Sequence, residues 1–110
     1  MQYEHIKVPD DGAPVTANPD HTLNVPDRPI IPCIEGDGIG IDVTPAMKSV
    51  VNAAVEKAYG AARAIAWLEV FAGQKADGIY GASHLLHEET LDELRRYVVT
   101  NKGPLATPLG

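Results

Sequence analysis

Several residue types are scarce in this 110-residue chain, and each shortage narrows what the protein can be. A single cysteine, Cys33, excludes an internal disulfide and is typical of a reducing compartment, so we expect a cytoplasmic protein. One Trp, one Phe and four Tyr leave the core to aliphatic side chains. No apolar run reaches the roughly 18 residues of a membrane span, and the first residues lack the basic and apolar regions of a signal peptide.

Basic residues are also in the minority. Nine Lys and Arg against fifteen Asp and Glu give a net charge of −6. Nucleic acids and anionic membrane surfaces select basic patches, so we expect neither as a partner. The hydrophobic share of 45% is ordinary for a globular chain, and the length suits one small domain or a piece of a larger one.

A strand, a glycine-rich turn and a helix follow one another between residues 29 and 60. The apolar run Ile30–Ile34 predicts a buried strand, which Pro32 would confine to a sheet edge or a strand end because proline cannot donate to the ladder. The turn at 36–40 reads Gly-Asp-Gly-Ile-Gly. A turn of this kind after a strand is where α/β proteins present ligand sites.

The helix after this turn has one apolar stripe. Two starting points are open: Thr44 as the N-cap with Pro45 in the first helical position, or a start near Gly40. We expect the helix to end at Tyr59, because Gly60 suits a left-handed cap. The stripe residues recur at spacings of three and four, and they are Met47, Val50, Val51, Ala54, Val55 and Ala58.

The rest of the chain predicts an α/β class. Residues 64–71 carry apolar side chains on both faces, which is typical of an interior strand. Residues 73–83 have a loop composition, a helix covers about 87–97, and a third strand covers 98–100. The order β-α-β-α-β favours consecutive parallel strands.

Residues 1–28 have no helical pattern and form a predicted N-terminal extension. Two β-prone runs, 15–17 and 22–25, flank the turn signal Asn18-Pro19-Asp20, so we expect a β-hairpin that covers a sheet edge or a partner surface. A flexible tail is the alternative. Residues 29–110 would then form a partial α/β domain.

Few residues carry an argument for chemistry by themselves. The spacing G-x-G-x-G is not the dinucleotide fingerprint, and Asp37 would repel a pyrophosphate, so a structural turn is favoured over phosphate binding. Lys102 follows a predicted strand and could pair with a carboxylate substrate, although solvated surface lysines are commoner. Thr107 has a hydroxyl in the same loop, with the same alternative. His84 and His87 could share a metal on one helical face, but no Cys or Asp nearby adds a third ligand, and surface histidines are common.

Three segments give the chain a family resemblance. LNVPDRPIIPCIEGDGIGIDVTPAM, VVNAAVEKAY and NKGPLATPLG resemble the N-terminal part of bacterial NADP-dependent isocitrate dehydrogenases, over about residues 6–110. IEGDGIG and KGPL are typical of the wider superfamily of decarboxylating dehydrogenases. NVPDRPIIP and AAVEKAY are similar to the isocitrate branch rather than to the isopropylmalate branch.

The resemblance implies both a fold and a reaction. The fold would be the isocitrate/isopropylmalate dehydrogenase-like α/β/α fold, not a Rossmann fold, with this chain as the N-terminal portion of the large domain, truncated before the serine-and-arginine segment that binds isocitrate. The reaction would be the oxidative decarboxylation of isocitrate to 2-oxoglutarate in the tricarboxylic acid cycle. It requires NADP and Mg²⁺ or Mn²⁺ and takes place in a homodimeric oxidoreductase. Catalytic residues and metal ligands would lie outside this chain, which alone should be inactive. The alternatives are a truncated, non-catalytic binding or structural module and an isopropylmalate-type decarboxylating dehydrogenase.

The resemblance also assigns residues. By position, Ile39 in the glycine turn and Leu105, Ala106 and Thr107 in the KGPL loop match family residues that line the nicotinamide pocket. Lys102 matches a lysine close to isocitrate and the nicotinamide. The family usually has two adjacent threonines after KGPL, and Ala106 replaces the first, which removes a hydroxyl expected to contact the cofactor.

Overall fold

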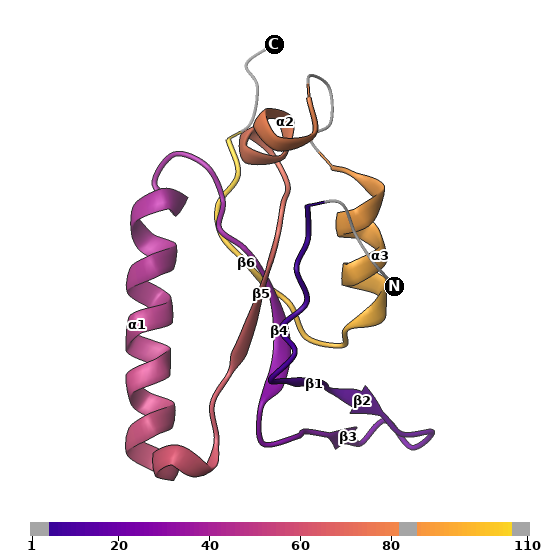
Figure 1. Cartoon of the computed structure of the whole chain (residues 1–110), viewed down its shortest axis with the longest axis vertical. Coiled ribbons are helices and arrows are strands. Elements are labelled where there is room, and N and C mark those ends of the chain that lie inside the picture. Colours follow the sequence, from indigo (N-terminus) through magenta and orange to yellow (C-terminus); the bar gives the residue numbers. More distant parts are fainter. Residues whose placement is uncertain (1–4, 82–85, 107–110) are drawn as a thin grey trace.

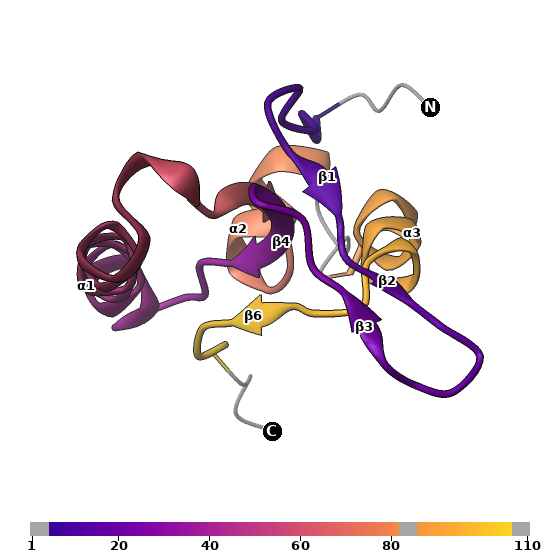
Figure 2. The same cartoon turned by 90° about the horizontal axis from the view of Figure 1, so that it is seen from below.

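The structure, a computed structural model, describes residues 5–81 and 86–106. A parallel sheet lies between two helices, with α1 on one face and α3 on the other (Figures 1 and 2). The elements are β1 (Ala13–Pro14), β2 (Thr16–Ala17), β3 (Leu23–Asn24), β4 (Pro29–Ile34), α1 (Gly40–Tyr59), the 3-10 turn η1 (Gly60–Ala62), β5 (Ala66–Val70), α2 (Gln74–Tyr80), α3 (Glu88–Arg96) and β6 (Asn101–Lys102). The predicted α/β class and the parallel strands are confirmed.

Strand β4 is the centre of the sheet. β5 pairs with one of its edges, and both β1 and β6 pair with the other, β1 at Pro29 and Ile30 and β6 at Cys33 and Ile34. The prediction that Pro32 would confine this strand to a sheet edge or a strand end is therefore wrong. In a parallel ladder alternate residues bond to the same side, so Pro32 faces the edge that Ile34 presents to β6. On that edge Pro32 lies in the gap between β1 and β6 and pairs with neither strand.

Strand β5 pairs only with β4 among the described residues, so the interior position predicted for it is not seen. Its side chains alternate: Leu68 and Val70 are buried, whereas Glu69 is exposed. The buried face joins a core of ten residues beneath α3: Ile6, Ile30, Ile34, Ala66, Leu68, Val70, Phe71, Ala72, Ala76 and Tyr97.

Helix α1 begins at Gly40 and ends at Tyr59, with Gly60 at a positive φ of 61° as its C-cap. The later start is therefore wrong: Thr44 lies inside the helix and its hydroxyl donates to the carbonyl oxygen of Glu35 at 2.6 Å. The apolar stripe is only partly covered. Val51 and Val55 are half-buried, whereas 69% of Val50 is exposed.

Residues 73–83 contain α2, which the loop prediction missed. The residues next to this helix include no side chain that caps it. Its first N–H groups donate instead to the carboxylate of Asp37, which is distant in the sequence. The helix predicted at 87–97 is confirmed as α3, with Nδ1 of His87 accepting from the N–H of Glu89 at 3.1 Å. The third strand begins at Asn101, beyond the predicted 98–100, because pairing with β4 defines it.

The N-terminal residues pack on the rest of the chain. β2 and β3 pair in antiparallel register as the predicted hairpin, which projects from the body (Figures 1 and 2). Asn18 and Asn24 exchange side-chain hydrogen bonds across it. β1 joins the main sheet and Ile6 enters the core, so this segment is anchored at both places. No helix in the described part of the chain is long and apolar enough to cross a membrane.

Candidate ligand site at the carboxyl ends of the strands

Three segments meet where β4, β5 and β6 end (Figure 1). They are the glycine turn at residues 36–40 together with Glu35, the start of α2, and the loop at residues 103–106, which follows β6. In parallel α/β sheets this edge is where ligands bind, because the loops that leave the strands gather there.

Glycines let the turn and the loop approach one another closely. A Cβ on Gly36, whose φ is +92°, would collide with the carbonyl oxygen of Pro104. A Cβ on Gly103 would collide with the carbonyl oxygen of Glu35. The N–H of Asp37 donates to the carbonyl of Pro104 at 2.7 Å, so the two backbones are joined directly. Side chains at these two glycines would separate the segments.

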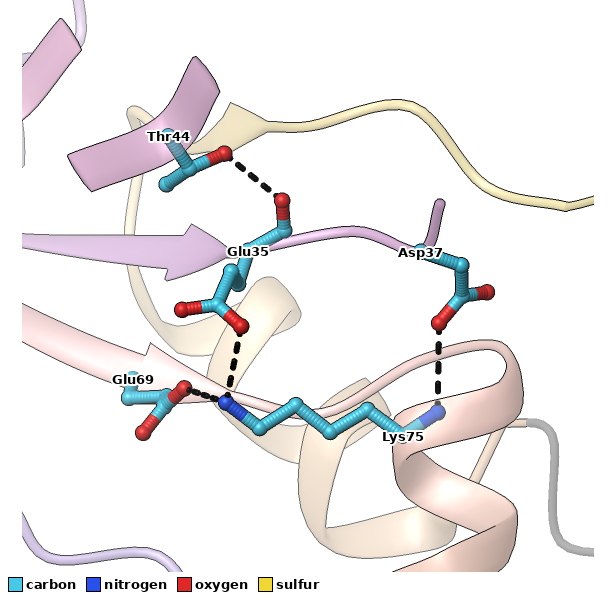
Figure 3. Close-up of polar contacts among 5 residues, drawn as sticks. All are labelled: Glu35, Asp37, Thr44, Glu69 and Lys75. Atoms are coloured by element: carbon cyan, nitrogen blue, oxygen red, sulfur yellow. Dashed lines mark hydrogen bonds and ion pairs between the residues drawn. The ribbon is translucent and has the colours of Figure 1, made fainter. Parts of the chain in front are cut away.

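Asp37 connects all three segments through its carboxylate, which belongs to a residue only 6% exposed. Oδ2 accepts from the N–H of Gln74 at 2.9 Å and from the N–H of Ala106 at 3.3 Å, and Oδ1 accepts from the N–H of Lys75 at 3.2 Å (Figure 3 draws the Lys75 bond). A buried carboxylate is tolerated where N–H groups satisfy it, as here. Asp37 thus acts as the acceptor that α2 needs at its first turn.

A lysine lies between two carboxylates next to this turn. Nζ of Lys75 lies 3.2 Å from Oε1 of Glu35 and 2.5 Å from Oε2 of Glu69 (Figure 3). Burial disfavours the charged ammonium, but the hydrogen bonds to Glu69 and Glu35 outweigh it and raise the pKa of Lys75. Lys75 and Glu35 border a cavity of about 360 Å³, which is lined by Glu35, Gly36, Asp37, Gly38, Ile41, Gln74 and Lys75.

A larger hollow, about 430 Å³, lies at the other end of the strands. Arg28, Arg63 and the C-terminal part of α1 line it. Both arginines are paired there, Arg28 with Asp11 at 4.0 Å and Arg63 with Asp27 at 3.6 Å. We take the smaller cavity as the candidate site, because it lies where the glycine turn and the strand ends meet.

The structure places four of the five residues that the resemblance assigned. Lys102 lies in β6 opposite Ile34, and its Nζ donates to the carbonyl of Gly103 at 3.1 Å. Ile39 precedes α1 and is 67% exposed. Leu105 is half-buried and packs against the core, whereas Ala106 is exposed and held through its N–H. Thr107 lies outside the described residues.

The cysteine and the two histidines considered as a metal pair offer no further site. Cys33 is buried, and burial raises the pKa of its thiol, which does not suit a nucleophile. His84 lies outside the described residues, and the His87 ring stacks on Tyr80 at 4.0 Å. Residues 5–81 and 86–106 contain no group of three or more His, Cys, Asp or Glu that could hold a metal ion.

Sequence reasoning missed the roles of Asp37 and Lys75. It interprets Asp37 only as an obstacle to phosphate. The position of this aspartate inside a glycine turn, together with Gly73 before a short polar helix, is a signal that could have suggested an internal cap. Lys75 has no local signal, because Glu35 lies 40 residues away from it.

The arrangement is that of an α/β protein with a candidate ligand site where the loops at the carboxyl ends of its parallel strands meet. No protein-family model matches the chain. Curated relatives do match: the NADP isocitrate dehydrogenases of Coxiella burnetii and Pseudomonas aeruginosa are each 56% identical over 110 residues, which is all of this chain and 26% of theirs. Isocitrate dehydrogenase (NADP) 1 of Colwellia maris is 62% identical over 91 residues, 83% of this chain and 22% of the relative. The chain belongs to the isocitrate dehydrogenase family and spans about a quarter of the length of these relatives.

Proposed function

We propose that this chain is the N-terminal segment of an NADP-dependent isocitrate dehydrogenase, which converts isocitrate to 2-oxoglutarate. The observation that carries the proposal is the 56% identity to enzymes of that name over the whole chain. On this proposal the fold is the α/β/α fold of the isocitrate and isopropylmalate dehydrogenases, and the sheet of β4, β5 and β6 belongs to its large domain. The intact enzyme would be a cytoplasmic homodimer. Isopropylmalate dehydrogenase is less well supported, because the Coxiella, Pseudomonas and Colwellia relatives are all isocitrate enzymes.

The chain would contribute one wall of the nicotinamide pocket and one charge for the substrate. Ile39 presents an exposed apolar side chain that suits one face of a pyridine ring. Leu105, Ala106 and Thr107 would line the same pocket. Lys102 pairs through its backbone with Ile34 in the sheet, and its ammonium would attract the carboxylates of isocitrate as a point charge.

The bound groups supply the remaining chemistry: NADP accepts the hydride, and Mg²⁺ or Mn²⁺ polarises the substrate oxygen. On this proposal the metal ligands come from the part of the enzyme outside this chain. The chain alone should then form no productive complex with substrate and metal, because positioning them requires the rest of the enzyme.

A chimera tests the proposal. Residues 1–110 replace the matching segment of the Coxiella burnetii enzyme, to which they are 56% identical. We expect the chimera to reduce NADP with isocitrate, and the 110-residue chain alone to show no turnover. A folded chimera without activity, beside an active parent enzyme, would contradict the proposal.

Lys102→Met in the chimera tests the assigned charge. We expect a fall in turnover of isocitrate of about a hundredfold, with an unchanged circular dichroism spectrum. Lys57→Met is the matched control, because it removes the same charge from the exposed last turn of α1. Unchanged kinetics in Lys102→Met would remove Lys102 from the site.

A non-catalytic module is the second candidate. Exposed apolar side chains on α1 favour it, among them Ile41, Val43 and Val50, because such a flank suits contact with another polypeptide. Intact-mass measurement of the native protein separates the two. A mass of 11.7 kDa supports the module, and a chain about four times larger supports the enzyme.

A further inference from the structure

We propose that Asp37 is a positioning residue. It holds the loop at residues 104–106, on the cofactor side of the site, and does not hold Lys102, on the substrate side. The inference rests on the proposed function for its catalytic consequence, but the positioning itself can be tested without it. Asp37 also lines the candidate cavity, but this role requires no contact of its side chain with substrate or cofactor. It acts through the backbone of residues 104–106.

The contacts of Asp37 reach the loop from two sides. Its backbone N–H donates to the carbonyl of Pro104 at 2.7 Å, and Oδ2 accepts from the N–H of Ala106 at 3.3 Å. The same Oδ2 accepts from Gln74 at 2.9 Å. The loop is thereby fixed relative to α2 as well as to the glycine turn, and two rigid elements define its position.

The carboxylate lies close to the backbone of Gly73. A Cβ on Gly73 would collide with Oδ2 of Asp37, and it would lie 2.9 Å from Cδ2 of Leu105. Gly73 has φ +76° and ψ −148°, a conformation that is essentially limited to glycine. The close approach of Asp37 and Gly73 therefore fixes the position of Leu105, which is assigned to the nicotinamide pocket.

The substrate side is held by different bonds. Lys102 pairs with Ile34 in the sheet, and the N–H of Gly103 donates to the carbonyl of Ile34 at 2.7 Å. Neither interaction involves the Asp37 side chain. Loss of the carboxylate should free the N–H of Ala106, while the backbone bond between Asp37 and Pro104 remains, and it should leave Lys102 in place.

Amide hydrogen exchange on the 110-residue chain tests the positioning. In Asp37→Asn we expect the amide of Ala106 to exchange about ten times faster or more, whereas the amide of Gly103 keeps its protection. Asp42→Asn is the matched control, because it removes an equal charge from the exposed first turn of α1. Unchanged exchange at Ala106, or equal acceleration at Ala106 and Gly103, would overturn the proposal.

Steady-state kinetics on the chimera test the consequence. Asp37→Asn should raise KM for NADP about tenfold while KM for isocitrate changes about twofold or less, a split that a general loss of stability would not produce. Equal changes in both constants, or no change, would overturn the catalytic part. An inactive wild-type chimera would instead count against the proposed function, and the exchange result at Ala106 would still decide the positioning.

Discussion

The hydroxyl of Thr44 donates a hydrogen bond to the carbonyl oxygen of Glu35 at 2.6 Å, and this bond ties α1 to the end of β4 (Figure 3). Thr44 is 3% exposed. A Cβ on Gly103 would lie 2.9 Å from its Oγ1, so the loop after β6 packs against the same hydroxyl. One threonine inside a helix therefore lies against both backbone segments that approach most closely in the site.

Thr44→Val should lower the free energy of unfolding by about 1–2 kcal/mol. The valine has nearly the same shape but leaves the carbonyl of Glu35 without this donor, and an unsatisfied buried acceptor is costly. Urea unfolding followed by circular dichroism measures the change. Thr44→Ser keeps the hydroxyl and should recover most of the loss, and equal losses in both variants would show that packing rather than the hydrogen bond matters.

Gly73→Ala and Gly78→Ala should change stability in opposite directions. Gly73 has positive φ and faces Oδ2 of Asp37, so alanine there should cost about 2 kcal/mol or more. Gly78 lies inside α2, and a Cβ there would meet no heavy atom within 4 Å. Alanine at 78 should therefore stabilise the chain by about 0.5–1 kcal/mol. Thermal unfolding of the pair is the measurement, and destabilisation by Gly78→Ala would contradict the environment seen for α2.

Glu93→Leu should stabilise the chain by about 1–3 kcal/mol. Glu93 is fully buried on α3, and neither carboxylate oxygen has a hydrogen-bond partner among the described residues. Its one ion pair there, with Nη1 of Arg96 at 3.9 Å, involves a side chain that is half exposed. Well-packed apolar residues commonly replace such a buried charge at no cost or with a gain.

The control for Glu93→Leu is Asp92→Asn, which breaks the surface pair with Arg95 on the same helix. Surface pairs contribute little, so we expect a change of about 0.5 kcal/mol or less. A loss of stability in Glu93→Leu, measured by urea unfolding, would show that the carboxylate has a partner that stabilises it.

Alkaline conditions should destabilise the chain. Burial raises the pKa of Cys33 above its usual 9.0, and burial together with the charge of Glu93 raises the pKa of Tyr97 above its usual 10.0. Both groups hold their protons more tightly in the folded chain. Their contribution to stability is therefore complete below about pH 9 and is lost as the pH rises through the folded-state pKa values.

Urea unfolding at about pH 8 and about pH 10 measures this decline. Cys33→Ala should make it shallower, because the variant has no thiol to ionise. An unchanged slope would contradict the role of the thiol.

Ala106→Thr in the chimera should tighten NADP binding. The added hydroxyl restores a group that the family resemblance places against the cofactor, and one such hydrogen bond is worth about 0.5–1.5 kcal/mol. Ala106 is exposed, so the larger side chain has room. Titration of the chimera with NADP measures the affinity, and Ala106→Val serves as the control for size. An equal effect of valine, or none with threonine, would count against placing residue 106 beside the cofactor.

Local patterns were enough to predict β4, α1, the hairpin and α3, because each has its own period, turn or cap in the sequence. They were insufficient for α2 and for the position of β6. The first N–H groups of α2 are satisfied by Asp37, 37 residues earlier, and β6 is defined by pairing with β4 rather than by its own composition. The site shows the same division. The glycine turn and the KGPL loop marked its place, but the carboxylate that joins them became visible only in three dimensions.

The two strands on either side of the gap at Pro32 have a consequence for the order in which the chain folds. The two strands on that edge of β4 come from opposite parts of the sequence, β1 from before β4 and β6 from the last part of the described chain. The contact of Cys33 with Asn101 closes 68 residues, so it costs more loop entropy than the pairing of Cys33 with Glu69. On a ribosome, β4, α1 and β5 can associate while the KGPL loop is still unsynthesised. We therefore expect the candidate site to form after β4 and β5 have paired.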